Sequence, residues 1–180
     1  MAEQDQVIER LRELDPRRTG TAELVALLES AQDADLAQLV ATSFARLITR
    51  ASGGQIRAVL AQPGPRTAVL AEIFRRMGEH LRADRAAHTT AVVHWRLSGG
   101  AGPGGYDRWE TVIENGTCVA HAEPSREPTA TITIHPVDFV RLITHNVSGP
   151  MLFITGKLKI KGDIGFAAGL PTLFDLPRAD

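Results

Sequence analysis

The spacing of the apolar residues changes near residue 85, and this change constrains the fold more than any other feature. Before it, apolar side chains recur every three or four residues, as in Leu24, Leu27 and Leu28, which is typical of helices with one buried face. After it, apolar and polar side chains alternate, as at Val93 and Trp95, which is typical of strands with one buried face. The sequence therefore predicts a helical first half and a sheet in the second.

Glycine and proline divide the helical half into segments. Three apolar stripes lie before residue 50, and Gly53–Gly54 and Gln62–Pro65 then interrupt the pattern twice. A short helical piece is expected over Gln55–Ala61, and a further amphipathic helix over residues 70–81. The apolar stripes of the first helices need cover, which either the rest of the chain or a second copy could supply.

The second half reads as strands joined by short connections. The glycine-rich segment Gly99–Gly105 lacks the Lys-Ser/Thr ending of a phosphate-binding loop and is expected to connect two strands. Asn115–Gly116 predicts a two-residue hairpin turn. Because four strands are nearly consecutive, an antiparallel sheet is expected. The predicted strands are Thr90–Ser98, Arg108–Glu114, Thr117–Ala122, Thr129–Ile134 and, later, Lys157–Lys161.

Two further helical segments are expected among the last strands and at the end of the chain. Pro136 occupies a favoured first-turn position, and the helix that it begins is expected to end at Gly149–Pro150. The tail Asp163–Leu176 is apolar on nearly all sides. A helix of that kind must be covered by other parts of a structure.

Composition and charge exclude several classes of protein. The chain has 180 residues, 43% of them hydrophobic, and a net charge of −1, so we expect one domain with an extension and no nucleic-acid binding. The first fifteen residues mix charges throughout and do not resemble a secretory signal. The single cysteine, Cys118, cannot form an internal disulfide. We therefore expect a cytoplasmic protein.

The sequence lacks several familiar motifs of catalytic and metal-binding sites. The chain has no GxSxG, HExxH or CxxC motif, and its six histidines show no i, i+4 pairing. Glu110 and Glu114 alternate with Trp109 and are expected on a solvated face. We therefore expect no catalytic residues, no metal, no cofactor and no enzymatic activity.

Several motifs of the second half occur in the order found in one known family. They are the segment Gly156–Phe174, the Trp-x-Thr-x-Ile-x-Asn-Gly hairpin at 109–116, the strand Thr129–Ile134 before Pro-x-Asp-Phe at 136–139, and Pro150–Met151. With these motifs, residues 66–176 resemble the sterol carrier protein 2 (SCP-2) family of lipid-binding domains. Residues 1–62 form a helical extension outside the resemblance.

The resemblance implies an α+β fold in which helices cover a five-stranded, mostly antiparallel sheet and enclose a hydrophobic tunnel. The implied function is non-enzymatic binding, and possibly transfer, of a lipid, fatty acyl, acyl-CoA or sterol-type ligand. The apolar composition of the second half agrees, since ligand cavities have mostly apolar walls. Two alternatives remain open. The same residues could form a filled core, and the chain could be an interaction module of a larger lipid-metabolising system that dimerises through its N-terminal helices.

The expected ligand-binding residues share apolar side chains on the inner faces of the predicted strands and helices. They are Val93, Trp95, Trp109, Ile113, Ile132, Phe139, Leu142, Ile143, Met151, Phe153, Leu158, Ile160, Ile164, Phe166, Leu170 and Phe174.

All three lysines of the chain are Lys157, Lys159 and Lys161, and they alternate with Leu158 and Ile160. In a strand their ammonium groups point to one side, which suggests weak docking to an anionic membrane surface. The alternative is that they protect an exposed edge strand from pairing with other chains.

The last predicted helix departs from the pattern of the family. Pro171 lacks an N–H group, and Gly169 makes bending easy. We therefore expect Asp163–Gly169 to form one short helix that Leu170–Leu176 leaves at an angle, with Leu173 and Phe174 folded back as a plug. The stretch Met151–Gly156 is also about one residue shorter than in the family.

Overall fold

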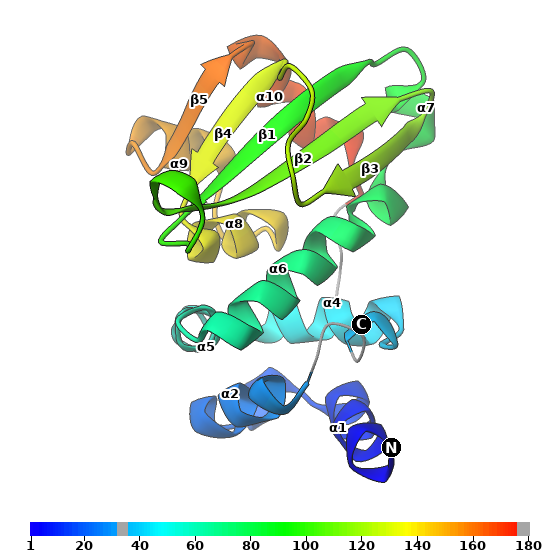
Figure 1. Cartoon of the computed structure of the whole chain (residues 1–180), viewed down its shortest axis with the longest axis vertical. Helices are drawn as coiled ribbons and strands as arrows, with labels where there is room; N and C mark the ends of the chain where they lie inside the picture. Colours follow the sequence, from blue (N-terminus) through cyan, green and yellow to red (C-terminus); the bar gives the residue numbers. More distant parts are fainter. Residues whose placement is uncertain (32–35, 176–180) are drawn as a thin grey trace. The chain divides into compact units, whose positions relative to one another are not determined.

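The computed structural model describes residues 1–31 and 36–175, which divide into two compact units, 1–73 and 74–175 (Figure 1). Leu176, the last residue of the predicted lipid-binding region, lies outside the described residues. The predicted boundary between residues 62 and 66 stays a prediction, and both compact units share helix α6 (Pro63–Met77).

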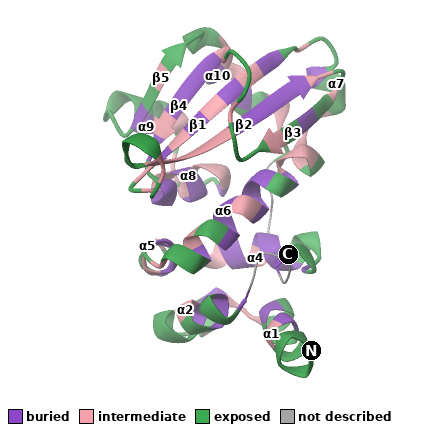
Figure 2. Cartoon of the chain, in the orientation of Figure 1, coloured by how far each residue is buried: buried purple, intermediate pink, exposed green. Residues whose placement is uncertain are grey.

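The first unit consists of helices. They are α1 (Ala2–Glu13), the short 3-10 turn η1 (Pro16–Arg18), α2 (Thr21–Ser30), α4 (Ala41–Arg50), α5 (Gly53–Leu60) and the first part of α6. Helix α1 contacts α2 and α4, and α2 contacts α5. The apolar stripes found in the sequence are buried within a single chain, with Leu11 and Leu24 at most 2% exposed (Figure 2). These stripes therefore do not need a second copy of the chain to cover them.

Helix boundaries in this unit follow from capping groups. Helix α5 begins at Gly53, two residues before the predicted start, because the Ser52 hydroxyl accepts a hydrogen bond from the Gln55 N–H and completes a capping box. Helix α6 begins at Pro63, so the Gln62–Pro65 segment starts a helix and does not separate two. Proline is tolerated in a first turn, where its missing N–H would have no partner within the helix.

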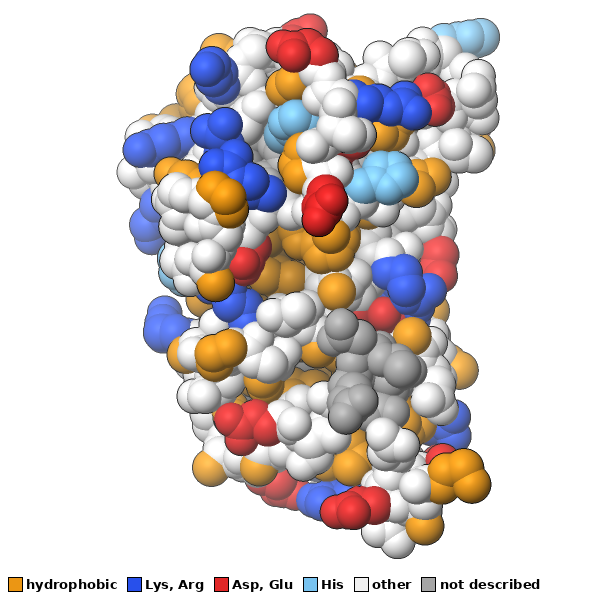
Figure 3. Space-filling model, in the orientation of Figure 1, with side chains coloured by type: hydrophobic (Ala, Val, Ile, Leu, Met, Phe, Trp, Pro, Cys, Tyr) orange, Lys and Arg blue, Asp and Glu red, His pale blue; other side chains and the backbone are white. Residues whose placement is uncertain are grey.

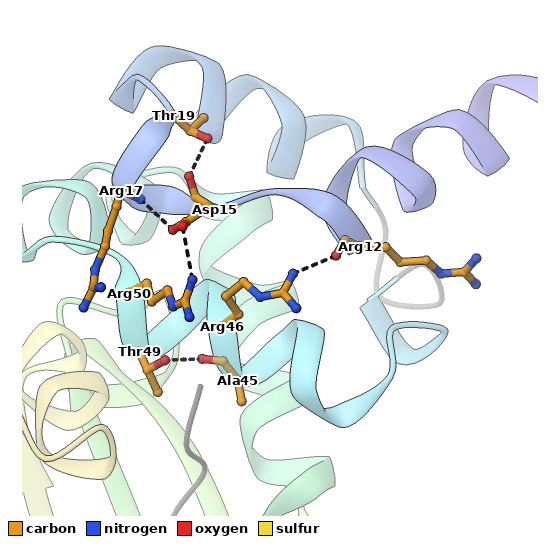
Figure 4. Close-up of polar contacts among 8 residues, drawn as sticks. All are labelled: Arg12, Asp15, Arg17, Thr19, Ala45, Arg46, Thr49 and Arg50. Carbon is orange, nitrogen blue, oxygen red and sulfur yellow. Dashed lines mark hydrogen bonds and ion pairs between the residues drawn. The ribbon is translucent and has the colours of Figure 1, made fainter. Parts of the chain in front are cut away.

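Polar side chains join the turn after α1 to helices α4 and α5. The Asp15 carboxylate accepts hydrogen bonds from the Arg17 N–H and the Arg50 guanidinium, both at 3.1 Å (Figure 4). The Gln55 side chain donates from Nε2 to the carbonyl oxygens of Pro16 and Thr19, both at 2.9 Å. These contacts satisfy backbone groups of the turn that would otherwise lose their water on burial.

A five-stranded sheet forms the centre of the second unit. Its strands are β1 (Ala91–Ser98), β2 (Tyr106–Glu114), β3 (Thr117–His121), β4 (Ala130–Ile134) and β5 (Leu158–Gly162), in the order β3-β2-β1-β4-β5. Three of the four strand pairs are antiparallel, as predicted. The central pair β1–β4 is parallel, so the sheet is mostly antiparallel, as the resemblance implied, and the antiparallel pairing of consecutive strands does not extend to β4. The segment 122–129 carries the chain across the sheet instead of turning back beside β3.

Helices and short turns complete this unit. They are η2 (Gly78–His80), α7 (Ala83–Ala86), η3 (Pro103–Gly105), α8 (Pro136–Ile143), α9 (Gly149–Ile154), α10 (Ile164–Gly169) and η4 (Leu170–Leu173). Helices α8 and α10 cover one face of the sheet (Figure 1). Gly149–Pro150 begins α9 and does not end α8, because the Ser148 hydroxyl caps the new helix by accepting from the Met151 N–H at 3.3 Å.

The C-terminal helix changes from an α-helix to a 3-10 turn next to Pro171, where a bend was expected. The α-helix ends at Gly169, as predicted, and a 3-10 turn follows directly. Pro171 cannot donate to the Ala167 carbonyl, and the Leu170 N–H bonds that oxygen instead. Gly169 itself has an ordinary right-handed helical conformation (φ −84°), so the change does not use the special freedom of glycine.

The segment after this turn pairs with residues near the end of α6. Phe174 is extended and forms an antiparallel bridge with Leu81. The Arg82 N–H donates to the Leu173 carbonyl at 2.7 Å, and the Asp175 N–H donates to the His80 carbonyl at 2.8 Å. Leu173 and Phe174 are half-buried. Their role as a movable plug stays a prediction.

Candidate functional site

One face of the sheet is mostly apolar. In β1 the buried side chains alternate strictly with half-buried ones, so Val93, Trp95 and Leu97 all point to this face. Ile113 of β2 and Ile132 of β4 continue the same face through the register of the sheet, and they are 0% and 4% exposed. The Trp95 indole N–H donates to the Thr111 hydroxyl at 3.1 Å. This face can therefore bind apolar groups and offers few polar ones.

Four aromatic rings pack together on this face. Phe74 of α6 stacks on Trp109 of β2 and on Phe139 of α8, with ring centroids 4.7 and 5.4 Å apart. Trp95 lies against Phe74 and Phe139 at 5.9 and 5.5 Å. Rings at these distances contact each other directly. The aromatic cluster is thus a filled part of the interior, and a ligand would have to lie beside it.

The opposite face of the sheet is polar, and its centre is covered. Glu110 was expected on a solvated face, but its side chain is 0% exposed. Its Oε2 accepts hydrogen bonds from the backbone N–H groups of Ser125 and Arg126, at 3.0 and 2.9 Å, and lies 3.0 Å from the His94 Nε2. The segment 122–129, which we call the strap, crosses this face (Figure 1). Glu110 is buried because it anchors the strap.

The environment of Glu110 lowers the pKa of its carboxyl group. Burial alone would raise the pKa, but the two backbone N–H donors of the strap and the contact with His94 together outweigh it. At neutral pH the Glu110 carboxyl group is therefore ionised within the protein. Its other oxygen, Oε1, has no hydrogen-bond partner among the described residues. Burial raises the pKa of the thiol of Cys118, a buried residue of β3, to about 11.

Among residues 1–31 and 36–175, no group of three or more His, Cys, Asp or Glu side chains could hold a metal ion. Within the same ranges, no helix is long and apolar enough to cross a membrane.

Comparison with known families decides the identity of this fold. Residues 70–175 match the family described as the SCP-2 sterol transfer family. The chain belongs to this family. The match covers the whole sheet and the helices on its apolar face, so the aromatic cluster and the strap are both parts of the SCP-2 domain.

Two known proteins that resemble this chain are considerably longer than it. Hydroxysteroid dehydrogenase-like protein 2 of Pongo abelii is 32% identical over 119 residues, which make up 66% of this chain and 28% of that protein. The solved structure of the inverting sec-alkylsulfatase Pisa1 from Pseudomonas sp. has a TM-score of 0.53 at 14% identity, and the match covers 95% of this chain and 30% of the sulfatase. The chain thus spans less than a third of either protein, and the likeness to the sulfatase concerns the fold alone.

The sixteen expected ligand-binding residues differ in their exposure to solvent, and they fall into buried, half-buried and exposed groups. The buried ones are Val93, Trp95, Ile113, Ile132, Phe139, Leu158 and Leu170. The half-buried ones are Trp109, Leu142, Ile143, Ile160, Phe166 and Phe174. The exposed ones are Met151, Phe153 and Ile164.

The three exposed residues correct the expectation that they line the interior. Met151 and Phe153 are 56% and 46% exposed because the segment 149–154 is a short helix, α9, which directs Leu152 inward and leaves its neighbours outside. Ile164 is 52% exposed because it occupies the first turn of α10.

Phe74 was missing from the expected set although it contacts the three other rings of the aromatic cluster. Its place in the apolar stripe of the predicted helix 70–81 was visible in the sequence. The stripe alone did not show that this helix reaches the apolar face of the sheet.

Proposed function

We propose that the SCP-2 domain binds a lipid or acyl-type ligand along the apolar face of its sheet and does not catalyse a reaction on it. The observation that carries this proposal is that the apolar interior continues beyond the filled aromatic cluster into side chains that are only half-buried. Leu142 and Ile143 of α8, Ile160 of β5 and Phe166 of α10 all have this intermediate exposure.

Half-buried apolar side chains on the covered side of a sheet favour a ligand with an apolar chain. Each leaves apolar surface in water that a bound hydrocarbon could cover. Membership of a family described by sterol transfer supports the same class of ligand. Catalysis would need convergent polar groups, whereas the buried acid Glu110 and its neighbour His94 lie on the opposite face, where Glu110 binds the strap and His94 contacts Glu110.

Binding of fatty acids of increasing length tests the proposal. We expect affinity to rise by roughly fourfold per methylene, the equivalent of about 0.8 kcal/mol, until the site is filled. Isothermal titration and displacement of a fluorescent fatty acid measure this directly. Native mass spectrometry of the protein purified from cells shows whether a lipid is already bound.

Two variants localise the binding. Ile143→Gln and Phe166→Gln place an amide among the half-buried apolar side chains and should weaken binding at least about tenfold. Val119→Gln is the matched control, because Val119 is an apolar residue of β3 that is 50% exposed and belongs to the polar face. A protein that carries no lipid and binds no fatty acid, acyl-CoA or sterol probe would refute the proposal.

A second candidate function follows from the length of the relatives. Since the chain matches only 28% of the dehydrogenase-like protein and 30% of the sulfatase, the SCP-2 domain could serve as an interaction module of a larger lipid-metabolising system. Multi-angle light scattering and the lipid assays separate the two candidates. A chain that associates with itself and binds no lipid probe would favour the interaction module.

A further inference from the structure

Exposed apolar side chains of α9, which we call the apolar tip, and a row of lysines occur together at one edge of the second unit. The exposed side chains of α9, namely Met151, Phe153 and Ile154, are 56%, 46% and 79% exposed. Lys157 follows Ile154 by three residues, no more than roughly 11 Å along the chain, and Lys159 and Lys161 continue along β5. Strand β5 is an edge strand.

The alternation along β5 directs its lysines to the polar face. Leu158 is 7% exposed and points inward, so Lys159 and Lys161 point away from the helices that cover the sheet. Lys159 is in register with Thr133 of β4, which is in turn in register with Arg96 of β1. Figure 3 shows Lys and Arg side chains gathered over this side of the sheet, with hydrophobic side chains next to them.

The ammonium groups of these three lysines can bind an anion from outside the protein. Within the described part of the chain, no ion pair involves Lys157, Lys159 or Lys161. The nearest acid along the chain, Asp163, uses a carboxylate oxygen to cap α10 by accepting from the Phe166 N–H at 2.8 Å. Protection of an edge strand would explain the lysines alone. It does not explain the three exposed apolar side chains beside them.

We propose that α9 and β5 form a docking surface for an anionic lipid bilayer, with Met151, Phe153 and Ile154 inserted among the acyl chains and the lysines held at the phosphate level. Apolar side chains flanked by cations have the polarity profile of the interface of such a bilayer. Lysine side chains are long enough to reach the headgroups while their stems lie along apolar surface. The docking requires no ligand in the interior of the domain, so it is independent of the function proposed above.

Co-sedimentation of the full chain with vesicles tests the docking surface. We expect binding to equimolar phosphatidylcholine and phosphatidylglycerol, weaker binding at high salt, and much weaker binding to phosphatidylcholine alone. Each lysine near an anionic surface contributes roughly fivefold to partitioning, so K157Q/K159Q/K161Q should lose on the order of 100-fold at low salt. M151S/F153S/I154S should lose at least about tenfold at any salt concentration. Val119→Ser, the matched exposed position on the opposite edge strand, should bind as the wild type does.

A fluorescence measurement locates the contact without removing it. In Phe153→Trp, the added indole should shift its emission to the blue when anionic vesicles are added, whereas in Val119→Trp it should not. Equal binding by the wild type and either triple variant, or an equal loss in Val119→Ser, overturns the proposal. So does a change of oligomeric state in M151S/F153S/I154S with unchanged vesicle binding, because the apolar tip would then be a contact between two copies.

Discussion

At the scale of single residues, Glu110 has the largest difference between its expected and observed environments. Its carboxylate accepts two backbone N–H groups from the strap and contacts His94, all within 3.0 Å. Replacing it by alanine should lower the free energy of unfolding by about 2–3 kcal/mol at neutral pH, because hydrogen bonds to a buried charged acceptor are lost. Urea denaturation measures the change. Glu114→Ala removes a partly exposed partner of Arg126 on the same face and should change stability by at most about 0.5 kcal/mol.

The lowered pKa of Glu110 gives this stabilisation a definite dependence on pH. Because the folded protein holds the pKa below the ordinary value of 4.5, the contribution is complete above about that pH. It is lost as the pH falls through the lowered value of the folded state. The stabilities of the wild type and Glu110→Ala should therefore converge in acid. A difference that persists unchanged below that range would show that the side chain acts by packing and not by charge.

At the scale of secondary-structure elements, Gly78 fixes how closely the end of α6 approaches β3. A Cβ atom added at this position would collide with the backbone carbonyl of Cys118. Gly78→Ala should therefore lower the free energy of unfolding by about 1–3 kcal/mol, since backbone atoms must move to make room. Gly169→Ala is the matched control, because nothing lies within 4 Å of its added Cβ and its backbone is helical. It should be neutral or stabilising by up to about 1 kcal/mol.

The sequence predicts single elements well because their signals are local. The alternation from Thr90 to Ser98 matches β1 to within one residue, and Asn115–Gly116, both with positive φ, form the expected turn between β2 and β3. The pairing of β4 with β1 has no such signal, since periodicity within a strand does not say which strand lies beside it. Glu110 was misjudged for a related reason. Its hydrogen-bond donors belong to a segment fifteen and sixteen residues away, which no periodicity within β2 reveals.

At the scale of the whole molecule, each of the two compact units has a core of its own. A substitution that destabilises one unit should therefore leave the stability of the other unit unchanged. Gln55 accepts from the Ser52 N–H and donates to the carbonyls of Pro16 and Thr19. Gln55→Ala should increase hydrogen exchange in α1, α2 and α5 and leave the protection of β1 and β2 unchanged. Mass spectrometry of peptic fragments measures both regions, with the exposed Arg57→Ala of the same helix as control. An equal loss of protection in the sheet would mean that the units unfold together.

The parallel pairing at the centre of the sheet also determines the order in which contacts can form. Strands β1, β2 and β3 are joined by short connections and can assemble early, because closing short loops costs little entropy. β4 must cross the width of this three-stranded assembly before it can pair. Until it arrives, β1 is an open edge that displays Val93, Trp95 and Leu97, the kind of edge that invites pairing between chains. In the folded protein Glu110 binds the strap that leads to β4, so weakening these contacts should favour the state in which this edge is open.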